Sequence, residues 1–456
     1  MFFSLGLISH LFALDLPIPP TLTTKVALTI MDASTNQVMY NYRESVPMRL
    51  ASNMKIITSY VALDQLGPDF SWPTKLAYDG TINQHTLKGN VYLIGGGDPT
   101  LSSRDLEQLL SQLRHQGITT INGDFILDSS IFNHLAPNSE LHPEPLAEYS
   151  VEPNGLLIDS NLSELSLSLK HHKITVTPKH LANYRFNNQL HLNPKSKASC
   201  DDSSEYITLQ ATTAQLVSLS GTLPPSCNGK KFRLNLLSTL VYNQRVIQQL
   251  LQQQHDHLSG RIQAGIAPSQ LVPIYTHNSA TLQDILPQMN KFSNNMLAKT
   301  LFLSLGAYRS ANQNTYSAAQ QIYRQTTARH WDFSELAAEN GAGLSRQEQL
   351  TTQHMAQLLY ALTKSPNYTN FMHSLPTPNE SGTLAHSFSE YRGRLYAKTG
   401  TLEDTKAYSG YFMAHNGHTY ILSLIANDIT NHGVNSELDQ FKQLVATSLL
   451  QVDALN

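Results

Sequence analysis

A serine and a lysine stand three residues apart within residues 49–57, as Ser52 and Lys55. The apolar residues that follow recur at helical spacing, which predicts a buried helix with both side chains on one face of its first turn. A serine hydroxyl becomes an effective nucleophile when a base lies within hydrogen-bond reach. A lysine amine can be that base if burial or a nearby cation lowers its pKa, and a helix N-terminus adds partial positive charge. The pair alone occurs by chance in many proteins, so ordinary helix residues are the alternative.

Two later stretches change that interpretation. An S-x-N motif stands at Ser293 and Asn295, and a K-T-G motif stands at residues 398–400. The chain order S-x-x-K, S-x-N, K-T-G is the motif set of penicillin-binding proteins and serine β-lactamases. Each motif is uninformative alone, but the three in order predict an acylating serine enzyme.

Composition and charge exclude several other classes of protein. The chain has 456 residues and a formal net charge of −3 without a basic run, so nothing indicates a nucleic-acid partner. Its histidines lack the helical i, i+4 pair with a glutamate that a zinc hydrolase needs, and its glycine-rich turn at residues 95–99 lacks the lysine of a phosphate loop. We therefore expect no metal and no cofactor.

The two cysteines, Cys200 and Cys227, lie in polar, turn-rich sequence with no neighbouring cysteine to form a metal knuckle. In an exported protein a disulfide between them is favoured, and two unpaired thiols are the alternative.

The N-terminus resembles the apolar core of a signal peptide. Residues 1–13 are mostly apolar and Ala13 could precede a cleavage site, but no Lys or Arg occurs before Lys25. Three explanations are open. The true start of the chain lies upstream of Met1, or the signal peptide is unusual, or the segment is a buried part of the fold. No other stretch is long enough to span a bilayer. We expect an exported protein without a stable membrane span.

Hydrophobic periodicity predicts an α+β catalytic domain, in which an antiparallel sheet is flanked by helices. Residues 25–32 and 36–42 alternate like a hairpin, three further strands are expected over residues 396–425, and the apolar residues of 438–449 predict a closing helix. Between these parts the character changes to short strands, with a helix over residues 104–116. The expected division is a signal segment at 1–20, the catalytic domain at 21–71 and 269–456, an inserted domain at 72–160 and 226–268, and a nested β-rich domain at 161–225.

With its motifs placed, the chain resembles the D-alanyl-D-alanine carboxypeptidase/endopeptidase family, the class C low-molecular-mass penicillin-binding proteins of the penicillin-binding protein 4 type. The long separation of Lys55 from Ser293 is similar to the large insertion of that family, and the stretches 95–101, 341–346 and 380–384 resemble it too. The likeness covers essentially the whole chain. It implies a serine β-lactamase/transpeptidase-like catalytic domain, interrupted by an inserted domain with a third domain nested in it.

The resemblance also implies roles for the first two motifs. Ser52 would accept the acyl group and Lys55 would be its base. Ser293 would relay a proton to the leaving amine, and Asn295 would hydrogen-bond the substrate amide and the Lys55 ammonium.

The third motif would bind the substrate. The charge of Lys398 would attract the substrate carboxylate and lower the pKa of the neighbouring lysine, and the hydroxyls of Thr399 and Thr401 would bind that carboxylate. Gly400 would let the substrate backbone approach the strand closely. The backbone N–H groups of Ser52 and Thr401 would form the oxyanion hole.

Two features depart from the family pattern. Where the family often has Asp-Gly-Ser-Gly-Leu-Ser-Arg, this chain has Asn340 and Ala342 in place of the Asp and the first Ser, and it keeps Arg346 as a contact to the peptide stem. The family also uses an acidic residue of the inserted domain to recognise the free amine of diaminopimelate. Glu144 or Glu148 could serve here, and the local sequence leaves both open.

The expected function is therefore a periplasmic serine DD-peptidase that cleaves D-Ala-D-Ala or D-Ala-diaminopimelate bonds of peptidoglycan. Its expected partners are peptidoglycan stem peptides and β-lactam antibiotics, with a homodimer as a possible assembly. A β-lactamase or esterase on the same scaffold is an alternative, although no deacylation base is evident. A catalytically silent cell-wall scaffold is another.

Overall fold

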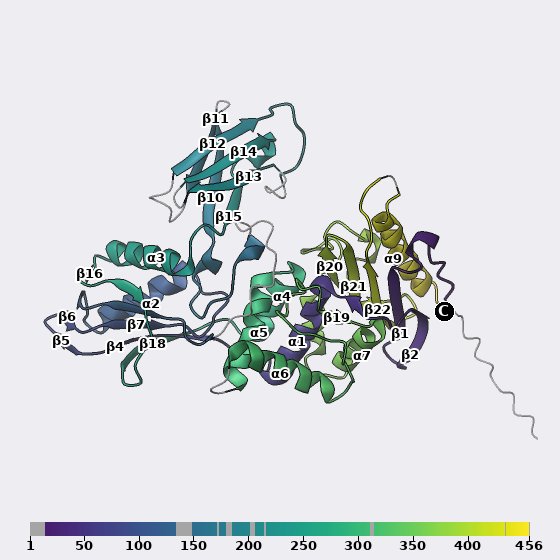
Figure 1. Ribbon diagram of the computed structural model, residues 1–456, viewed down its shortest axis with the longest axis horizontal. Coiled ribbons are helices and arrows are strands. Elements are labelled where there is room, and N and C mark those ends of the chain that lie inside the picture. The colour runs from purple at the N-terminus through teal and green to yellow at the C-terminus, as the bar shows by residue number, and fades with distance from the viewer. Residues whose placement is uncertain are drawn as a thin grey trace, which may run out of the picture. The chain divides into compact units, whose positions relative to one another are not determined.

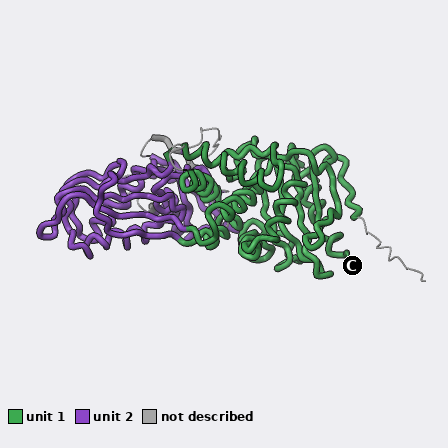
Figure 2. The backbone as a smooth tube through the Cα atoms, turned by 90° about the horizontal axis from the view of Figure 1, so that it is seen from below, with its two compact units in different colours: residues 1–70, 133–140, 280–456 green, residues 71–132, 141–279 purple. Residues whose placement is uncertain are grey.

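The structure is a computed structural model (Figure 1), and it describes residues 14–133, 148–170, 173–178, 185–200, 206–213, 216–310, 314–433 and 435–455. Ala13 and Glu144, which the sequence singles out, lie outside these residues. The chain divides into two units (Figure 2). Unit 1 comprises Met1–Phe70, Asn133–Glu140 and Ala280–Asn456, and unit 2 comprises Ser71–Phe132 and Leu141–Ser279.

Unit 1 is built on a five-stranded sheet in which every neighbouring pair is antiparallel. The alternation of apolar residues predicted its first hairpin, and the expected antiparallel run near the C-terminus is confirmed. In spatial order the strands are β2 (Gln37–Tyr42), β1 (Val26–Asp32), β22 (Thr419–Asn427), β21 (Thr405–Met413) and β20 (Leu395–Leu402). The K-T-G motif therefore lies on an edge strand, where part of the backbone is not used by the sheet.

Helices cover both faces of this sheet. Helix α9 (Glu437–Asp453) packs its apolar stripe on one face, and Ser436 and Asp439 form a capping box at its start. Helix α7 (Thr352–Thr363) lies on the other face, where the Tyr411 hydroxyl donates to the Leu359 carbonyl oxygen at 2.8 Å. The predicted closing helix and the α+β class are confirmed.

Helix α1 (Met54–Gln65) is buried on nearly all sides, since several helices pack against it. The Tyr323 hydroxyl donates to Thr58 Oγ1 at 2.8 Å, and the Asn290 amide donates to Ser59 Oγ at 3.1 Å. Its neighbours are α4 (Leu282–Lys291), α5 (Asn295–Arg309) and α6 (Thr315–Ala328), and α8 (Tyr368–Ser374) packs against α4. A helix surrounded in this way can hold a lysine out of water.

Short elements join the sequence around Ser52 to the later loops. The 3-10 helix η2 (Ala51–Asn53) precedes α1, and the two-residue strands β3 (Met48–Arg49) and β19 (Gln349–Leu350) pair antiparallel. The remaining short helices of this unit are η1 (Pro20–Leu22) and η7 (Ser389–Tyr391). Of the predicted signal segment, Leu14 and Leu16 are buried in the core that α9 covers.

The described part of unit 2 contains two larger sheets and the α-helices α2 (Ser103–His115) and α3 (Thr239–Gln253). Along α2, which confirms the helix predicted over residues 104–116, four leucines recur at helical spacing and are buried: Leu106, Leu109, Leu110 and Leu113. One sheet has the order β17 (Ile262–Ala264), β9 (Phe125–Asp128), β7 (Val91–Ile94), β4 (Pro73–Tyr78) and β18 (Val272–Asn278). The other has the order β16 (His257–Leu258), β8 (Thr120–Asn122), β6 (Thr86–Lys88) and β5 (Thr81–Asn83).

The β-rich stretch predicted for residues 161–225 forms two three-stranded sheets together with β15. One contains β11 (Lys173–Pro178), β10 (Ser163–Lys170) and β15 (Lys231–Leu234), and the other contains β12 (Arg185–Leu192), β14 (Leu216–Leu223) and β13 (Thr208–Thr213). Among its described residues, unit 2 also has the short helices η3 (Glu148–Ser150), η4 (Asp159–Asn161) and η6 (Pro225–Cys227). The expected nested domain stays a prediction, because the chain separates here into only two units.

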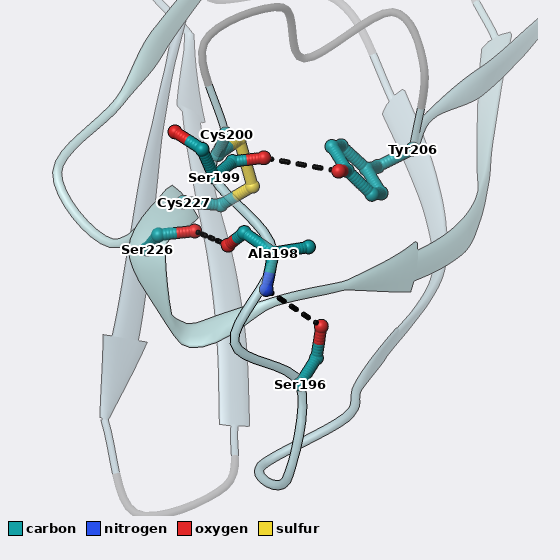
Figure 3. Close-up of a disulfide and its surroundings, with 7 residues drawn as sticks. All are labelled: Ser196, Ala198, Ser199, Cys200, Tyr206, Ser226 and Cys227. Atoms are coloured by element: carbon teal, nitrogen blue, oxygen red, sulfur yellow. Dashed lines mark hydrogen bonds between the residues drawn. A yellow bond between two sulfur atoms is a disulfide. The ribbon is translucent and has the colours of Figure 1, made fainter.

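A disulfide joins Cys200 to Cys227 (Figure 3). Beside it the Tyr206 hydroxyl donates to the Ser199 carbonyl oxygen at 2.9 Å, and Ser226 Oγ donates to the Ala198 carbonyl oxygen at 2.7 Å. The pairing that the sequence favoured is confirmed, and the alternative of two unpaired thiols is wrong.

Candidate active site

Ser52 lies on a tight turn rather than in the helix itself. It belongs to η2, whose first residue, Ala51, has a positive φ of 47°. Lys55, on the first turn of α1, is fully buried, and its Nζ lies 3.1 Å from Ser52 Oγ. The predicted common face therefore brings the hydroxyl and the amine into hydrogen-bond contact, while Ser52 keeps partial exposure.

Two further groups hold the Lys55 amine. Its Nζ lies 2.7 Å from Asn295 Oδ1 and 2.7 Å from the carbonyl oxygen of Ala342. Asn295 is the first residue of α5, where the Asn294 side chain caps the helix by accepting from the Leu297 N–H at 3.0 Å. Three oxygens from three segments thus determine where the amine points.

The S-x-N and K-T-G motifs meet through a second lysine. Lys398 on β20 is fully buried, and its Nζ donates to Ser293 Oγ at 3.0 Å and to the Thr399 carbonyl oxygen at 2.7 Å. Burial lowers the pKa of Lys398 from 10.5 to about 7. Ser293 adopts a left-handed φ of 55°, which turns the chain before α5. The three motifs that the sequence predicted to cooperate are therefore assembled in unit 1.

Asn53 ties the turn at Ser52 to the K-T-G strand. It is fully buried, and its amide nitrogen donates to the Lys398 carbonyl oxygen at 2.9 Å while its oxygen accepts from Ser409 Oγ at 2.8 Å. Sequence reasoning missed this residue, because one asparagine inside S-x-x-K carries no signal of its own.

Gly400 has a structural reason to lack a side chain. A Cβ at this position would lie 2.8 Å from the Leu50 carbonyl oxygen and 3.1 Å from Ala51 Cβ. The backbone that approaches the strand closely here is that of the turn leading to Ser52. The substrate approach expected at Gly400 stays a prediction.

The two threonines of the K-T-G-T segment have polar neighbours that the sequence did not indicate. Thr399 Oγ1 donates to Thr383 Oγ1 at 2.6 Å, and Lys406 Nζ donates to Thr401 Oγ1 at 2.7 Å. Thr383 belongs to the family-like stretch 380–384, and its N–H donates to the Lys291 carbonyl oxygen at 3.0 Å. The resemblance had singled out that stretch without assigning it a role.

A buried glutamate supports the loop that contacts Lys55. Glu348 is fully buried, and its carboxylate accepts from four backbone N–H groups at 2.9–3.0 Å. These N–H groups belong to Glu339, Asn340, Gly341 and Gly343. Burial raises the pKa of Glu348, and the four N–H groups oppose that rise. The carboxylate therefore shapes the loop that presents the Ala342 carbonyl to Lys55.

The same loop explains one departure from the family pattern. Asn340 Oδ1 accepts from the Ala342 N–H at 2.8 Å, so the side chain closes the turn locally. Gly343 has a φ of +86°, and a Cβ there would lie 1.8 Å from the Ala51 carbonyl oxygen. The loop and the turn at Ser52 are therefore in direct backbone contact, which only a glycine permits.

Arg346 lies beside the site but is already paired. Its Nη1 donates to Asp404 Oδ2 at 3.0 Å, and Arg49 binds the same carboxylate at 3.2 Å. Arg346 is still 58% exposed along its side chain. The contact to a peptide stem stays a prediction, and it would have to share the guanidinium with Asp404.

Within the described ranges, no group of three or more His, Cys, Asp or Glu side chains is placed to hold a metal ion. Of the two candidate acids of the inserted domain, the structure includes only Glu148, at the start of η3.

Comparison with known proteins matches the chain to one family model. Residues 15–448 match the model described as "D-Ala-D-Ala carboxypeptidase 3 (S13) family". A D-alanyl-D-alanine carboxypeptidase of Actinomadura sp. (strain R39) is 25% identical over 426 residues, which cover 89% of this chain and 77% of that protein. The D-alanyl-D-alanine carboxypeptidase DacB of Haemophilus influenzae is 24% identical over 443 residues, which cover 92% of this chain and 90% of that protein.

Solved structures share the fold. Penicillin-binding protein 4 (dacB) of Haemophilus influenzae superposes with a TM-score of 0.78 at 22% identity, over 95% of this chain and 97% of that one. The same protein has also been solved in complex with a β-lactam. A predatory endopeptidase of Bdellovibrio bacteriovorus superposes with a TM-score of 0.53 at 18% identity, over 93% of both chains.

Proposed function

The chain belongs to the D-Ala-D-Ala carboxypeptidase 3 (S13) family, and on that premise we propose that Ser52 is the nucleophile with which it cleaves peptidoglycan stem peptides. The protein is a serine-type D-Ala-D-Ala peptidase, as its family and its carboxypeptidase relatives establish. The observation that carries the assignment to Ser52 is the position of the Lys55 amine, which contacts Ser52 Oγ, Asn295 Oδ1 and the Ala342 carbonyl at once.

Acylation begins at the Ser52–Lys55 contact. When the amine is neutral, the 3.1 Å separation lets the Ser52 proton pass to Lys55 Nζ as the oxygen attacks the carbonyl carbon of the penultimate D-Ala. Asn295 and Ala342 supply oxygens for the ammonium that forms. The backbone N–H groups of Ser52 and Thr401 would bind the oxyanion, and one such donor typically contributes about 3 kcal/mol to lowering the barrier.

The leaving amine takes its proton through Ser293. The proton that Lys55 took from Ser52 would pass through the Ser293 hydroxyl to the departing nitrogen, which leaves Lys55 neutral to activate the water of deacylation. Lys398 Nζ donates to Ser293 Oγ at 3.0 Å and keeps its charge in this step. Lys398, Thr399 and Thr401 would bind the substrate carboxylate. Water then hydrolyses the acyl-enzyme and releases the shortened peptide.

The same chemistry acylates Ser52 with β-lactams, whose strained amide replaces the peptide bond. The Haemophilus relative solved with a β-lactam supports this part of the proposal. Rapid β-lactam turnover would need a carboxylate positioned to activate water. The Glu348 carboxylate accepts from four backbone N–H groups, so it is not such a base, and we expect a long-lived adduct.

We place the enzyme in the periplasm, where peptidoglycan is accessible. The disulfide between Cys200 and Cys227 supports an oxidising compartment. No helix in the described part of the chain has the length and apolar character to cross a bilayer. Cleavage of D-Ala-diaminopimelate cross-links is proposed beside carboxypeptidase activity, in line with the endopeptidase that shares the fold. The homodimer stays a prediction.

Mass spectrometry of the intact protein after incubation with benzylpenicillin tests the proposal. Wild type should gain one penicilloyl group, and Ser52→Ala should gain none. A D-Ala-D-Ala peptide and a cross-linked peptide dimer, assayed in parallel, separate the two peptidase activities. A folded wild type that forms no adduct and releases no D-Ala would overturn the acyl-enzyme assignment and favour the silent scaffold.

A further inference from the structure

A third lysine, Lys406, stands next to the strand of the K-T-G motif, and the mechanism above does not use it. Lys406 lies on β21 directly across from Thr401 on β20. Its Nζ donates to Thr401 Oγ1 at 2.7 Å. Thr401 is exposed and Lys406 is half-buried, so the ammonium lies beside a hydroxyl that solvent and ligands can reach.

Among the residues that the structure describes, no carboxylate forms an ion pair with Lys406 Nζ. The charged group that acts on it is the like-charged Lys442 of α9. Burial, followed by repulsion from Lys442, lowers the pKa of Lys406. A half-buried cation that faces another cation is stabilised when an anion binds beside it.

The lysine of the K-T-G motif cannot supply this charge equally well. Lys398 is fully buried, and its amine is already bound by Ser293 Oγ and the Thr399 carbonyl oxygen. Lys406 is only half-buried, and it lies across from the exposed Thr401. Because the Thr401 oxygen accepts from Lys406, its hydroxyl proton is left to donate to an incoming anion.

We propose that Lys406 is a specificity-determining residue that, with Thr401, binds the C-terminal carboxylate of the peptide substrate. This inference rests on the proposed DD-peptidase function. It makes the enzyme selective for peptides that end in a free carboxylate over the same peptides ending in an amide. A carboxylate bound equally before and during acylation lowers KM and leaves kcat unchanged.

The test compares diacetyl-L-Lys-D-Ala-D-Ala with its C-terminal amide in steady-state kinetics. Lys406→Met removes the charge and the donor, and Lys406→Gln removes the charge but keeps a donor for Thr401. Lys442→Met is the matched control, because it removes an equal charge from an exposed position on α9. Both Lys406 variants should raise KM for the acid about tenfold, which corresponds to one charge-assisted hydrogen bond at a partly exposed site. Cleavage of the amide should match wild type in every variant. Lys442→Met should not raise KM for the acid, because the charge that it removes repels the Lys406 ammonium.

Equal losses on the acid and the amide would overturn the assignment, and so would an effect of Lys442→Met as large as that of Lys406→Met. If Lys406→Met does not fold, Lys406→Gln decides alone. Failure of the proposed function looks different, because wild type would then cleave neither peptide and would not be acylated by benzylpenicillin.

Discussion

Replacing Gly343 by alanine should disable Ser52 while leaving the fold largely intact. Gly343 has a φ of +86°, and its Cβ would lie 1.8 Å from the Ala51 carbonyl oxygen and 2.9 Å from the Ser52 nitrogen. A side chain at such a φ costs about 1–2 kcal/mol. The distance from this Cβ to the Ala51 carbonyl oxygen is shorter than a normal van der Waals contact by more than about 1 Å. The loop or the turn must therefore move by at least that amount.

That movement separates the groups that act together. The loop carries the Ala342 carbonyl that binds Lys55, and the turn carries Ser52. A displacement of about 1 Å at reacting groups can cost about a hundredfold in rate. We therefore expect the second-order rate constant of benzylpenicillin acylation to fall about a hundredfold in Gly343→Ala.

Gly417→Ala is the control that isolates backbone strain. Gly417 has a φ of +83°, and a Cβ there meets nothing within 4 Å. It should lose about 1–2 kcal/mol of stability, measured by urea unfolding, and keep the wild-type acylation rate. A folded Gly343→Ala protein that is acylated as fast as wild type would refute the view that contact between loop and turn positions the nucleophile.

Three further predictions follow from single groups. Burial lowers the pKa of Lys398 to about 7, so the charge proposed to attract the substrate carboxylate is lost as pH rises through that value. The rate constant of acylation should therefore fall above about pH 7. Lys398→Arg should shift this fall in the pH–rate profile to higher pH. The unfolded lysine keeps its proton to about 10.5, so the unfolding free energy should rise with pH between these values, and a flat urea-derived profile in wild type would contradict the shift. Cys200→Ser should lower the unfolding free energy by about 3–4 kcal/mol, since the disulfide closes a loop with a sequence separation of 27, and it should leave penicillin labelling of Ser52 unchanged. Asn53→Leu should cost about 1–3 kcal/mol, because the buried Lys398 carbonyl loses the Asn53 amide and the Ser409 hydroxyl keeps only Ser423 Oγ, at 3.2 Å. An unchanged melting temperature would argue against this bridge.

Much of the fold follows from local patterns in the sequence. The alternation of residues 25–32 and 36–42 predicts the first hairpin, and the leucine spacing of α2 predicts its buried stripe. The three motifs predict the nucleophile and its neighbours, because their order along the chain is itself informative. The main local difference is that Ser52 lies on a 3-10 turn before α1, and helix periodicity does not mark where such a turn ends.

The contacts that complete the site have no local signal. Lys55 contacts Asn295 and Ala342, which lie 240 and 287 positions further along the chain. Glu348 binds the loop at Asn340 because the backbone N–H groups of that loop point toward its carboxylate. Arg346 is conspicuous in the sequence as a ligand for the peptide stem, yet in the fold its guanidinium is bound by Asp404.

The sequence alone therefore determined which residues are predicted to carry the acyl-transfer chemistry, because residue type and spacing decide what a side chain can do. The tertiary structure decided which groups surround them. Asn53 beneath Lys398, Glu348 beneath the loop and Lys406 beside Thr401 become neighbours only when the edge strand, the central helix and the later loops pack together. Packing between distant segments sets those distances, and no window of sequence contains them.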